Sequence, residues 1–305
     1  MIRNFLLLGF SLVFCACNNE SVFSDGDMAV KLLAQIGSTQ LSKTVTDTDG
    51  SVSFYDNDKV GMFVENVENP FLWTYKNNIW EAEKSVEWEN RSDDFEFLAY
   101  YPCEYTEGVL RTSVPMPDLS VQTGNIDDIG KKDFLVGRCV TSYSDNNGIV
   151  SFAGENSFIH VFSLLHLNIV NENRSQSFVM ESCTFSGEGI VTPYVYSFDS
   201  SSPGMKKSGT EEVSVLQIED LSSLSSVTVL VNPVVMDEPL KFTLRYTVDG
   251  HKYEASAGLV KSLTAGSFNK LTLRLVDGEL SMIGNEVRDW NVIMLEDIVL
   301  IGTSM

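Results

Sequence analysis

Apolar and polar residues alternate without a break along Lys241-Phe242-Thr243-Leu244-Arg245-Tyr246-Thr247-Val248, and the run ends in Asp249-Gly250. A period of two places every second side chain on the same face of an extended strand, so this stretch predicts a strand with one face in a core. Asp-Gly suits a tight turn, because both central positions of a type I′ turn need a positive φ. The stretch therefore predicts the first strand of a β-hairpin.

The same alternation recurs on both sides of this hairpin. It appears at residues 271–275, 227–231, 95–101 and 28–36, and residues 158–170 form a nearly continuous apolar run. Helical periodicity is scarce. Many short strands separated by Gly, Asn, Asp and Pro are typical of sandwiches and barrels. The sequence therefore predicts an all-β fold.

The N-terminus has the pattern of a bacterial export signal. Arg3 precedes the apolar run Phe5–Phe14, and Ala16 stands directly before Cys17. A charged start, a short apolar stretch and a small residue before the cleavage site define such a signal. The run is well short of the roughly 20 residues that a membrane-spanning helix needs. The pattern resembles a bacterial lipobox, which predicts lipidation of Cys17; a plain signal peptide with an incidental cysteine is the alternative.

These signals divide the chain into four parts. We predict a lipoprotein signal peptide over residues 1–16 and a polar tether over 17–27. Two β-sandwich domains follow, one over residues 28–148 and one over 149–305, with the boundary near Asn146-Asn147-Gly148.

Charge and cysteine content narrow the function. The formal net charge of −21 argues against nucleic acid as a partner. Cys15 leaves with the signal and Cys17 takes the lipid, so three cysteines remain, at 103, 139 and 183. They form either one disulfide or three buried thiols, and we favour the thiols. No metal-ligand cluster is visible, so we expect no metal and no cofactor.

The histidines do not indicate a metal site. His160 and His166 fall within one predicted strand, about 20 Å apart at roughly 3.3 Å per residue, so they cannot share an ion. We interpret both as core or half-buried residues, and His251, after the turn, as solvated.

The acidic pairs do not indicate a catalytic site. The pairs at 93–94, 127–128 and 211–212 are sequence neighbours. Glycosidase carboxylates must face one another, whereas neighbours in a strand point to opposite faces. We interpret these pairs as exposed turns and loops, and we expect no enzyme.

Aromatic residues gather at Phe71, Trp73, Tyr75, Trp80 and Trp88. Exposed Trp and Tyr can stack on sugar rings, which would support glycan binding. Packing against the adjacent sheet is the alternative that we favour, because aromatic side chains contribute strongly to protein cores.

Six segments together resemble the fimbrillin family of Bacteroidetes. Their order and spacing behind a lipobox carry the resemblance, although Leu164 stands where lysine is common. The segments are Asp58-Lys59-Val60-Gly61-Met62-Phe63-Val64, Phe97-Leu98-Ala99-Tyr100-Tyr101-Pro102, Asp133-Phe134-Leu135-Val136-Gly137, Phe158-Ile159-His160-Val161-Phe162-Ser163-Leu164-Leu165, Leu263-Thr264-Ala265-Gly266 and Asp289-Trp290-Asn291.

This resemblance implies two transthyretin-like β-sandwich domains in tandem and no catalytic activity. It also implies a lipid-anchored, surface-exposed protein of the outer membrane and the fimbrium. Other fimbrial subunits would be its partners, with a host or bacterial surface glycan or protein as a receptor. A glycan-binding lipoprotein of a polysaccharide-uptake system is the alternative function.

The resemblance further implies assembly by strand donation, in which a protease removes the first strand and the next subunit fills the groove. Residues 28–36 are the candidate removable strand, and residues 37–50 the candidate cleavage loop. The family commonly has an arginine at the cleavage site, whereas this loop has only Lys43, and the first arginine of the mature chain is Arg91. Either another protease cuts at Lys43, or the subunit stays uncut as an anchor. Residues 292–301 are either a donor strand or a fixed core strand.

Overall fold

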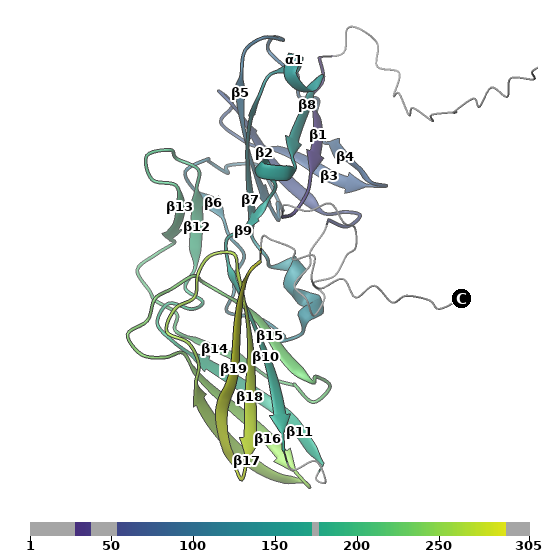
Figure 1. The fold of residues 1–305 in the computed structure, drawn as a ribbon. Coiled ribbons are helices and arrows are strands. Elements are labelled where there is room, and N and C mark those ends of the chain that lie inside the picture. The colour runs from purple at the N-terminus through teal and green to yellow at the C-terminus, as the bar shows by residue number, and fades with distance from the viewer. Residues whose placement is uncertain (1–27, 38–53, 173–176, 291–305) are drawn as a thin grey trace, which may run out of the picture.

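The protein is built almost entirely from β-strands, as a computed structural model of the chain shows (Figure 1). The structure describes residues 28–37, 54–172 and 177–290. The only helices in these ranges are short: α1 (Tyr143–Asn146) and the 3₁₀ turns η1 (Ile126–Lys131) and η2 (Gly154–Asn156). The all-β prediction is therefore confirmed.

The N-terminal block consists of one large sheet covered by a pair of strands. The pair is β1 (Lys31–Ala34) and β8 (Ile149–Phe152), which run parallel to each other. The large sheet is antiparallel throughout, with the strand order β4 (Ile79–Ala82), β3 (Phe71–Lys76), β2 (Lys59–Val64), β5 (Phe95–Tyr101), β7 (Leu135–Thr141) and β9 (Ile159–His160).

The C-terminal block consists of two four-stranded sheets. One has the order β15 (Ser226–Val231), β10 (Ser163–Asn171), β18 (Ser267–Val276) and β19 (Glu279–Asp289). The other has the order β14 (Val215–Ile218), β11 (Phe178–Ser186), β16 (Lys241–Val248) and β17 (His251–Gly258).

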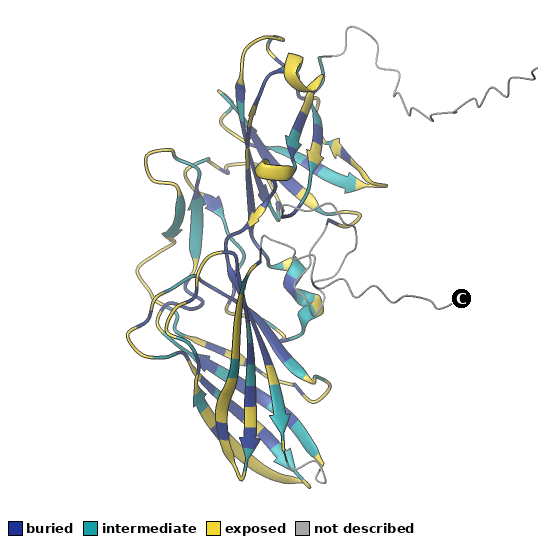
Figure 2. Cartoon of the chain, in the orientation of Figure 1, coloured by how far each residue is buried: buried dark blue, intermediate teal, exposed yellow. Residues whose placement is uncertain are grey.

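The predicted hairpin is the last pair of this second sheet. Strands β16 and β17 are antiparallel, and Asp249 and Gly250 between them have φ values of 48° and 81°. Alternate residues of β16, such as Phe242 and Leu244, are buried between the sheets. Figure 2 shows the resulting pattern, in which buried and exposed segments alternate along the strands of both sheets.

The chain crosses from one block to the other within the apolar run 158–170. Ile159 and His160 form β9, which pairs with β7, and the next strand, β10, begins at Ser163 in the C-terminal sheet. The two histidines therefore lie in different strands of different sheets, and the expectation that they share one strand is wrong. The sequence does not reveal the break between β9 and β10, because the two residues that join these strands, Val161 and Phe162, are apolar and buried.

Strand pairing keeps residues 149–160 with the N-terminal block. Strand β8 pairs with β1, and β9 pairs with β7, so the chain leaves this block about a dozen residues later than the predicted boundary at 148. Asn147 and Gly148 both have positive φ and form a turn within the block rather than a linker. The division into two transthyretin-like domains stays a prediction.

An arm from the C-terminal half packs against the N-terminal sheet. The arm is the hairpin of β12 (Tyr194–Ser197) and β13 (Gly204–Lys207), and β12 also pairs with β6 (Val114–Pro115). The ring of Phe198, in the loop of the arm, lies 6.1 Å from that of Phe63 in β2. The main cluster of buried residues consequently runs from the N-terminal sheet into the C-terminal sandwich.

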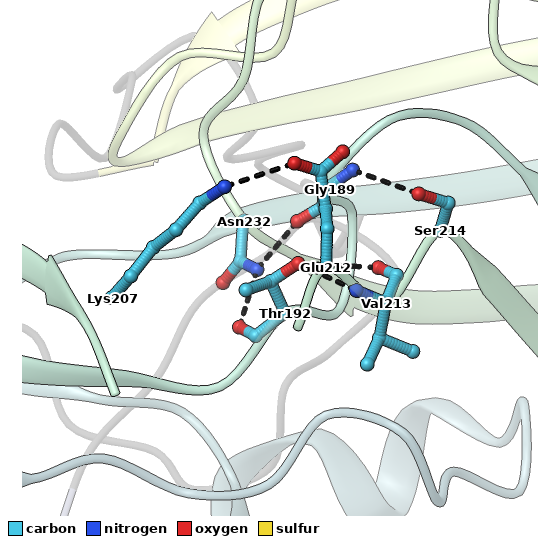
Figure 3. Close-up of polar contacts among 7 residues, drawn as sticks. All are labelled: Gly189, Thr192, Lys207, Glu212, Val213, Ser214 and Asn232. Carbon is cyan, nitrogen blue, oxygen red and sulfur yellow. Dashed lines mark hydrogen bonds and ion pairs between the residues drawn. The ribbon is translucent and has the colours of Figure 1, made fainter. Parts of the chain in front are cut away.

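Buried polar contacts fix the base of the arm (Figure 3). The side-chain amide of Asn232, which is 1% exposed, donates to the carbonyl oxygens of Gly189 (2.8 Å) and Thr192 (2.9 Å). The backbone N–H of Val213 donates to the hydroxyl of Thr192 at 2.9 Å. These bonds give hydrogen-bond partners to main-chain groups in the loop that leads from β11 into the arm.

We expect Asn232→Ala to lower the free energy of unfolding by about 1–3 kcal/mol, because it removes the side-chain donor that serves two buried carbonyl groups. Urea denaturation measures the loss. Asn285→Ala, at an exposed position of β19, is the control and should change stability by less than about 0.5 kcal/mol. Equal losses in the two variants would contradict this role for Asn232.

Candidate functional site

The N-terminal segment 28–37 lies in a groove between two other segments. On one side it runs parallel to β8, where the N–H of Lys31 donates to the carbonyl of Gly148 (3.0 Å) and that of Gln35 to Phe152 (2.8 Å). The pairing continues beyond β8, because Phe158 and Gln35 share a further bond of 2.9 Å. The segment is therefore held as a strand over most of its length.

The other side of the groove is the segment Val86–Trp88. The N–H of Val30 donates to the carbonyl of Val86 (2.8 Å), and the N–H of Trp88 donates to the carbonyl of Met28 (2.9 Å). Main-chain partners thus hold the whole segment, with Val86–Trp88 bonded to residues 28–30 and β8 and Phe158 bonded to residues 31–37. We call the space that it fills the strand groove, bounded by β8, by Val86–Trp88 and by the inner face of the six-stranded sheet.

The side chains of the segment alternate between the groove and solvent. Val30, Leu32 and Ile36 are 7–8% exposed, whereas Leu33 is 46% exposed. Burying an aliphatic side chain of this size contributes roughly 1.5–3 kcal/mol. The strand predicted over residues 28–36 is confirmed for its central part, which forms β1.

Aromatic rings form much of the groove floor. Trp88 packs edge-on against Phe97, with ring centroids 5.2 Å apart, near the end where Met28 enters. Near the Ile36 end, Phe54 contacts Trp80 (5.0 Å) and Phe158 (5.6 Å). These side chains belong to the same buried cluster as Val30, Leu32 and Ile36, so loss of the strand would expose apolar surface along the whole groove.

Two indole groups in this floor are incompletely satisfied. Within the described residues, the N–H groups of Trp73 and Trp80 are buried and have no hydrogen-bond acceptor. A buried donor without a partner costs about 1–3 kcal/mol. The strand that now fills the groove therefore leaves these two donors unpaired.

The tryptophans predicted as either a glycan platform or a core are core residues. Trp73, Trp80 and Trp88 are all at most 7% exposed, while Phe71 and Tyr75 are half-buried. Rings in these positions cannot stack on a sugar without unfolding the sheet. The glycan-binding alternative that rested on them is not favoured.

Three predicted functional positions lie outside the described residues. They are the lipidation site Cys17, the processing site Lys43 and the segment 292–301. Their roles stay predictions. The structure does place the last described residue before the loop, Gly37, with its N–H bonded to the carbonyl of Phe158 (3.0 Å).

The remaining cysteines are buried thiols, as favoured from the sequence. Cys103, Cys139 and Cys183 are free and at most 2% exposed. Burial raises the pKa of Cys103 to about 11 and that of Cys183 to about 12. Because the thiolate is the nucleophilic form, these positions are poorly suited to thiol chemistry at neutral pH.

Both strand histidines are buried, as interpreted from the sequence, and each has a hydrogen-bonding partner. His166 Nδ1 lies 2.8 Å from the hydroxyl of Thr228, and burial lowers its pKa. His160 Nδ1 lies 2.7 Å from Asp133 Oδ2, and its ring stacks on Trp290 at 3.7 Å between centroids. Sequence analysis missed this triad, since Asp133 is 27 residues from His160 and Trp290 is 130 residues away.

The acidic pairs lie at the surface and are not brought together. Asp93, Asp94, Glu211 and Glu212 are exposed, and Asp127 and Asp128 lie in the first turn of η1. No group of three His, Cys, Asp or Glu side chains among the described residues could hold a metal ion. Likewise, no helix in the described part of the chain has the length and apolar character to cross a membrane.

The protein is thus built from β-strands, and main-chain hydrogen bonds and apolar contacts hold its first strand. The fimbrillin-like family matches residues 27–290. The chain belongs to this family, and the resemblance predicted from its motifs is confirmed.

Two solved structures share the fold at low sequence identity. A protein assigned to cell adhesion from Bacteroides uniformis is 17% identical, with a TM-score of 0.61 over 87% of this chain and 100% of that chain. A second one, from Bacteroides ovatus, is 14% identical, with a TM-score of 0.59 over 87% of this chain and 98% of that chain. Comparison with curated proteins finds no match.

We expect Leu32→Ala to lower the free energy of unfolding by about 2–5 kcal/mol, because it removes a buried side chain and leaves a cavity in the groove. Leu33→Ala, one residue along on the exposed face, should cost less than about 0.5 kcal/mol. Chemical denaturation of the two variants compares them directly. Similar values for both would show that segment 28–37 does not sit in the groove in solution.

Proposed function

We propose that this fimbrillin-like protein is a fimbrial or cell-adhesion subunit that assembles at the cell surface by exchanging the strand in its groove. The main support is that segment 28–37 has main-chain partners along its length and buries alternate side chains. A groove of this kind accepts any strand that offers the same alternation. Other fimbrial subunits are the proposed partners.

Removal of the resident strand requires a cut in the chain after Gly37. Lys43 is the basic residue of the segment 38–50 and is our proposed processing site. Because an arginine-specific protease would not act there, the proposal requires a protease that accepts lysine. An uncut subunit would instead remain at the membrane as an anchor.

The proposed role needs no catalysis. Membership of the fimbrillin-like family supports a structural function, in which the protein offers sheet edges and surface to its neighbours. We propose that the lipid on Cys17 tethers the precursor to the outer membrane, with residues 18–27 as the spacer. More than one acyl chain is needed for stable anchoring, which a lipid-modified cysteine supplies.

Controlled release of the strand tests assembly. Residues 40–46 are replaced by the recognition sequence of a site-specific protease, and the cut protein is followed by gel electrophoresis without boiling and after boiling in detergent. We expect a ladder of boiling-resistant oligomers after cutting. The same recognition sequence in place of residues 199–203, in the loop of the arm, is the control and should give no ladder.

A cut protein that loses segment 28–37 and stays monomeric would contradict strand exchange. Deletion of residues 292–301 in the cut variant separates the two interpretations of that segment. Loss of the ladder with a soluble monomer identifies a donor strand. An insoluble or unfolded product identifies a fixed core strand.

Lipidation is tested at the two cysteines of the signal region. We expect Cys17→Ser to abolish incorporation of labelled palmitate and to release the protein from the membrane fraction of a Bacteroidetes host. Cys15→Ser should leave labelling intact, because Cys15 is removed with the signal. Label that persists in Cys17→Ser would contradict the anchor site.

A further inference from the structure

Strand β4 is an edge strand of the six-stranded sheet, and its hairpin with β3 fixes the direction of its main-chain groups. Tyr75 of β3 lies opposite Trp80 of β4. The N–H and the carbonyl of Tyr75 bond to Asp58 and Asn57, on the side away from β4. Opposed residues of an antiparallel pair alternate between bonded and non-bonded. Trp80 and, two residues later, Ala82 therefore direct their N–H and carbonyl groups away from β3, toward the free edge.

The resident strand β1 also has main-chain groups on the side away from β8. The N–H groups of Lys31 and Gln35 donate to carbonyl groups at and beside β8. Main-chain groups of successive residues in a strand point to opposite edges. Those of Leu32 and Ala34 therefore point away from β8.

These two edges face each other across an interval that we call the seam, between residues 32–34 of β1 and residues 80–82 of β4. Cα atoms of the two strands approach within 8 Å, and Figure 1 shows β1 between β8 and β4. In the part of the chain that the structure describes, however, β1 pairs only with β8 and β4 only with β3. The chain bends at Glu83 and Lys84, and main-chain bonding to the resident segment begins again at Val86. The seam is therefore a gap in the pairing around the strand groove.

The seam has no room for an additional strand. Paired strands lie about 4.7–4.9 Å apart, so a strand inserted between β1 and β4 would need them roughly 9.5 Å apart. Their closest Cα atoms are nearer than that. A strand can consequently pair with β4 only by taking the place of β1.

Trp80 also has an unused side-chain donor. Its indole N–H is buried and has no acceptor among the described residues, while its ring centroid lies 5.0 Å from those of Phe54 and Tyr75. The residue is 7% exposed, so water has little access to its polar groups. Buried N–H and carbonyl groups without partners are rare in proteins. The resident strand is therefore an incomplete match for this side of the groove.

We propose that β4 is the second edge of the strand-acceptor site, and that the strand of an incoming subunit pairs with the main chain of Trp80 and Ala82. The incoming strand replaces β1 and lies between β8 and β4, with main-chain partners on both edges. Such a partner is an extended segment with apolar side chains at alternate positions, as strand addition requires. The inference rests on the proposed function, because it names the contact that favours the incoming strand over the resident one.

A proline at position 82 tests the role of β4. In the chain with a protease site in place of residues 40–46, Ala82→Pro removes the N–H that faces the seam but no bond to β3. Proline is tolerated where the N–H of an edge strand points away from the sheet. After cutting, we expect boiling-resistant oligomers to form at least tenfold more slowly than from the unsubstituted chain, because the incoming strand loses a donor and meets the proline ring.

Lys252→Pro in β17 is the matched control. Lys252 is the second residue after the two-residue turn of the β16–β17 hairpin, as Trp80 is in the β3–β4 hairpin, so its N–H also points to a free sheet edge. Assembly of this variant should stay within twofold of the unsubstituted chain. Equal rates for the two proline variants would overturn the inference and leave strand exchange standing. Absence of oligomers even from the unsubstituted cut chain would overturn the proposed function, and the inference with it.

Hydrogen exchange examines the seam without any substitution in β4. In the uncut monomer, the N–H of Ala82 should exchange at least tenfold faster than that of Glu81, which points to β3. In the oligomers that form after cutting, exchange at Ala82 should slow at least tenfold. Slow exchange at Ala82 in the monomer, or exchange that assembly leaves unchanged, would contradict the pairing with β4.

Discussion

The need of buried main-chain groups for hydrogen-bond partners governs this molecule. Segment 28–37 is the clearest case, since Val86–Trp88 pairs with its first residues and β8 with the residues that follow. Without an occupant, the groove would expose unpaired N–H and carbonyl groups and an aromatic floor at the same time. Unpaired buried polar groups are rare in proteins, so the empty groove is not a stable end state. The fold therefore requires a strand there, while the strand need not come from the same chain.

The same requirement ties the two blocks together. The arm completes its sheet with β6, and the segment before η1 completes the edge of β15 through Gln122 and Gly124. Each half of the chain thus supplies strands or caps to the other half. A subunit interlocked in this way cannot bend freely at one linker.

Alternation in the sequence predicted the parts of the fold in which one face of a strand is buried. The hairpin at Asp249-Gly250 and the strand around Leu32 are examples. The packing of the tryptophans was predicted from the contribution of aromatic side chains to protein cores. Prediction failed where both faces of a segment are buried. Residues 158–170 contain two strands in different sheets, but a nearly continuous apolar run carries no clear periodicity that could reveal the break. The Asp133, His160 and Trp290 cluster and the Asn232 contacts depend on residues brought together only by the topology.

Two features of the resident strand would favour the strand exchange that we propose. Its regular pairing to β8 is parallel and short, and parallel pairing is slightly less stable per residue than antiparallel pairing. It also leaves the indole N–H groups of Trp73 and Trp80 without acceptors among the described residues. An incoming strand that pairs over a greater length, or that brings an acceptor to either indole, would be bound more tightly. Exchange can then proceed downhill without an external energy source once the covalent link after Gly37 is broken. While the chain is intact, its covalent link holds the resident strand at a high effective concentration near its own groove. Cutting the chain removes that advantage.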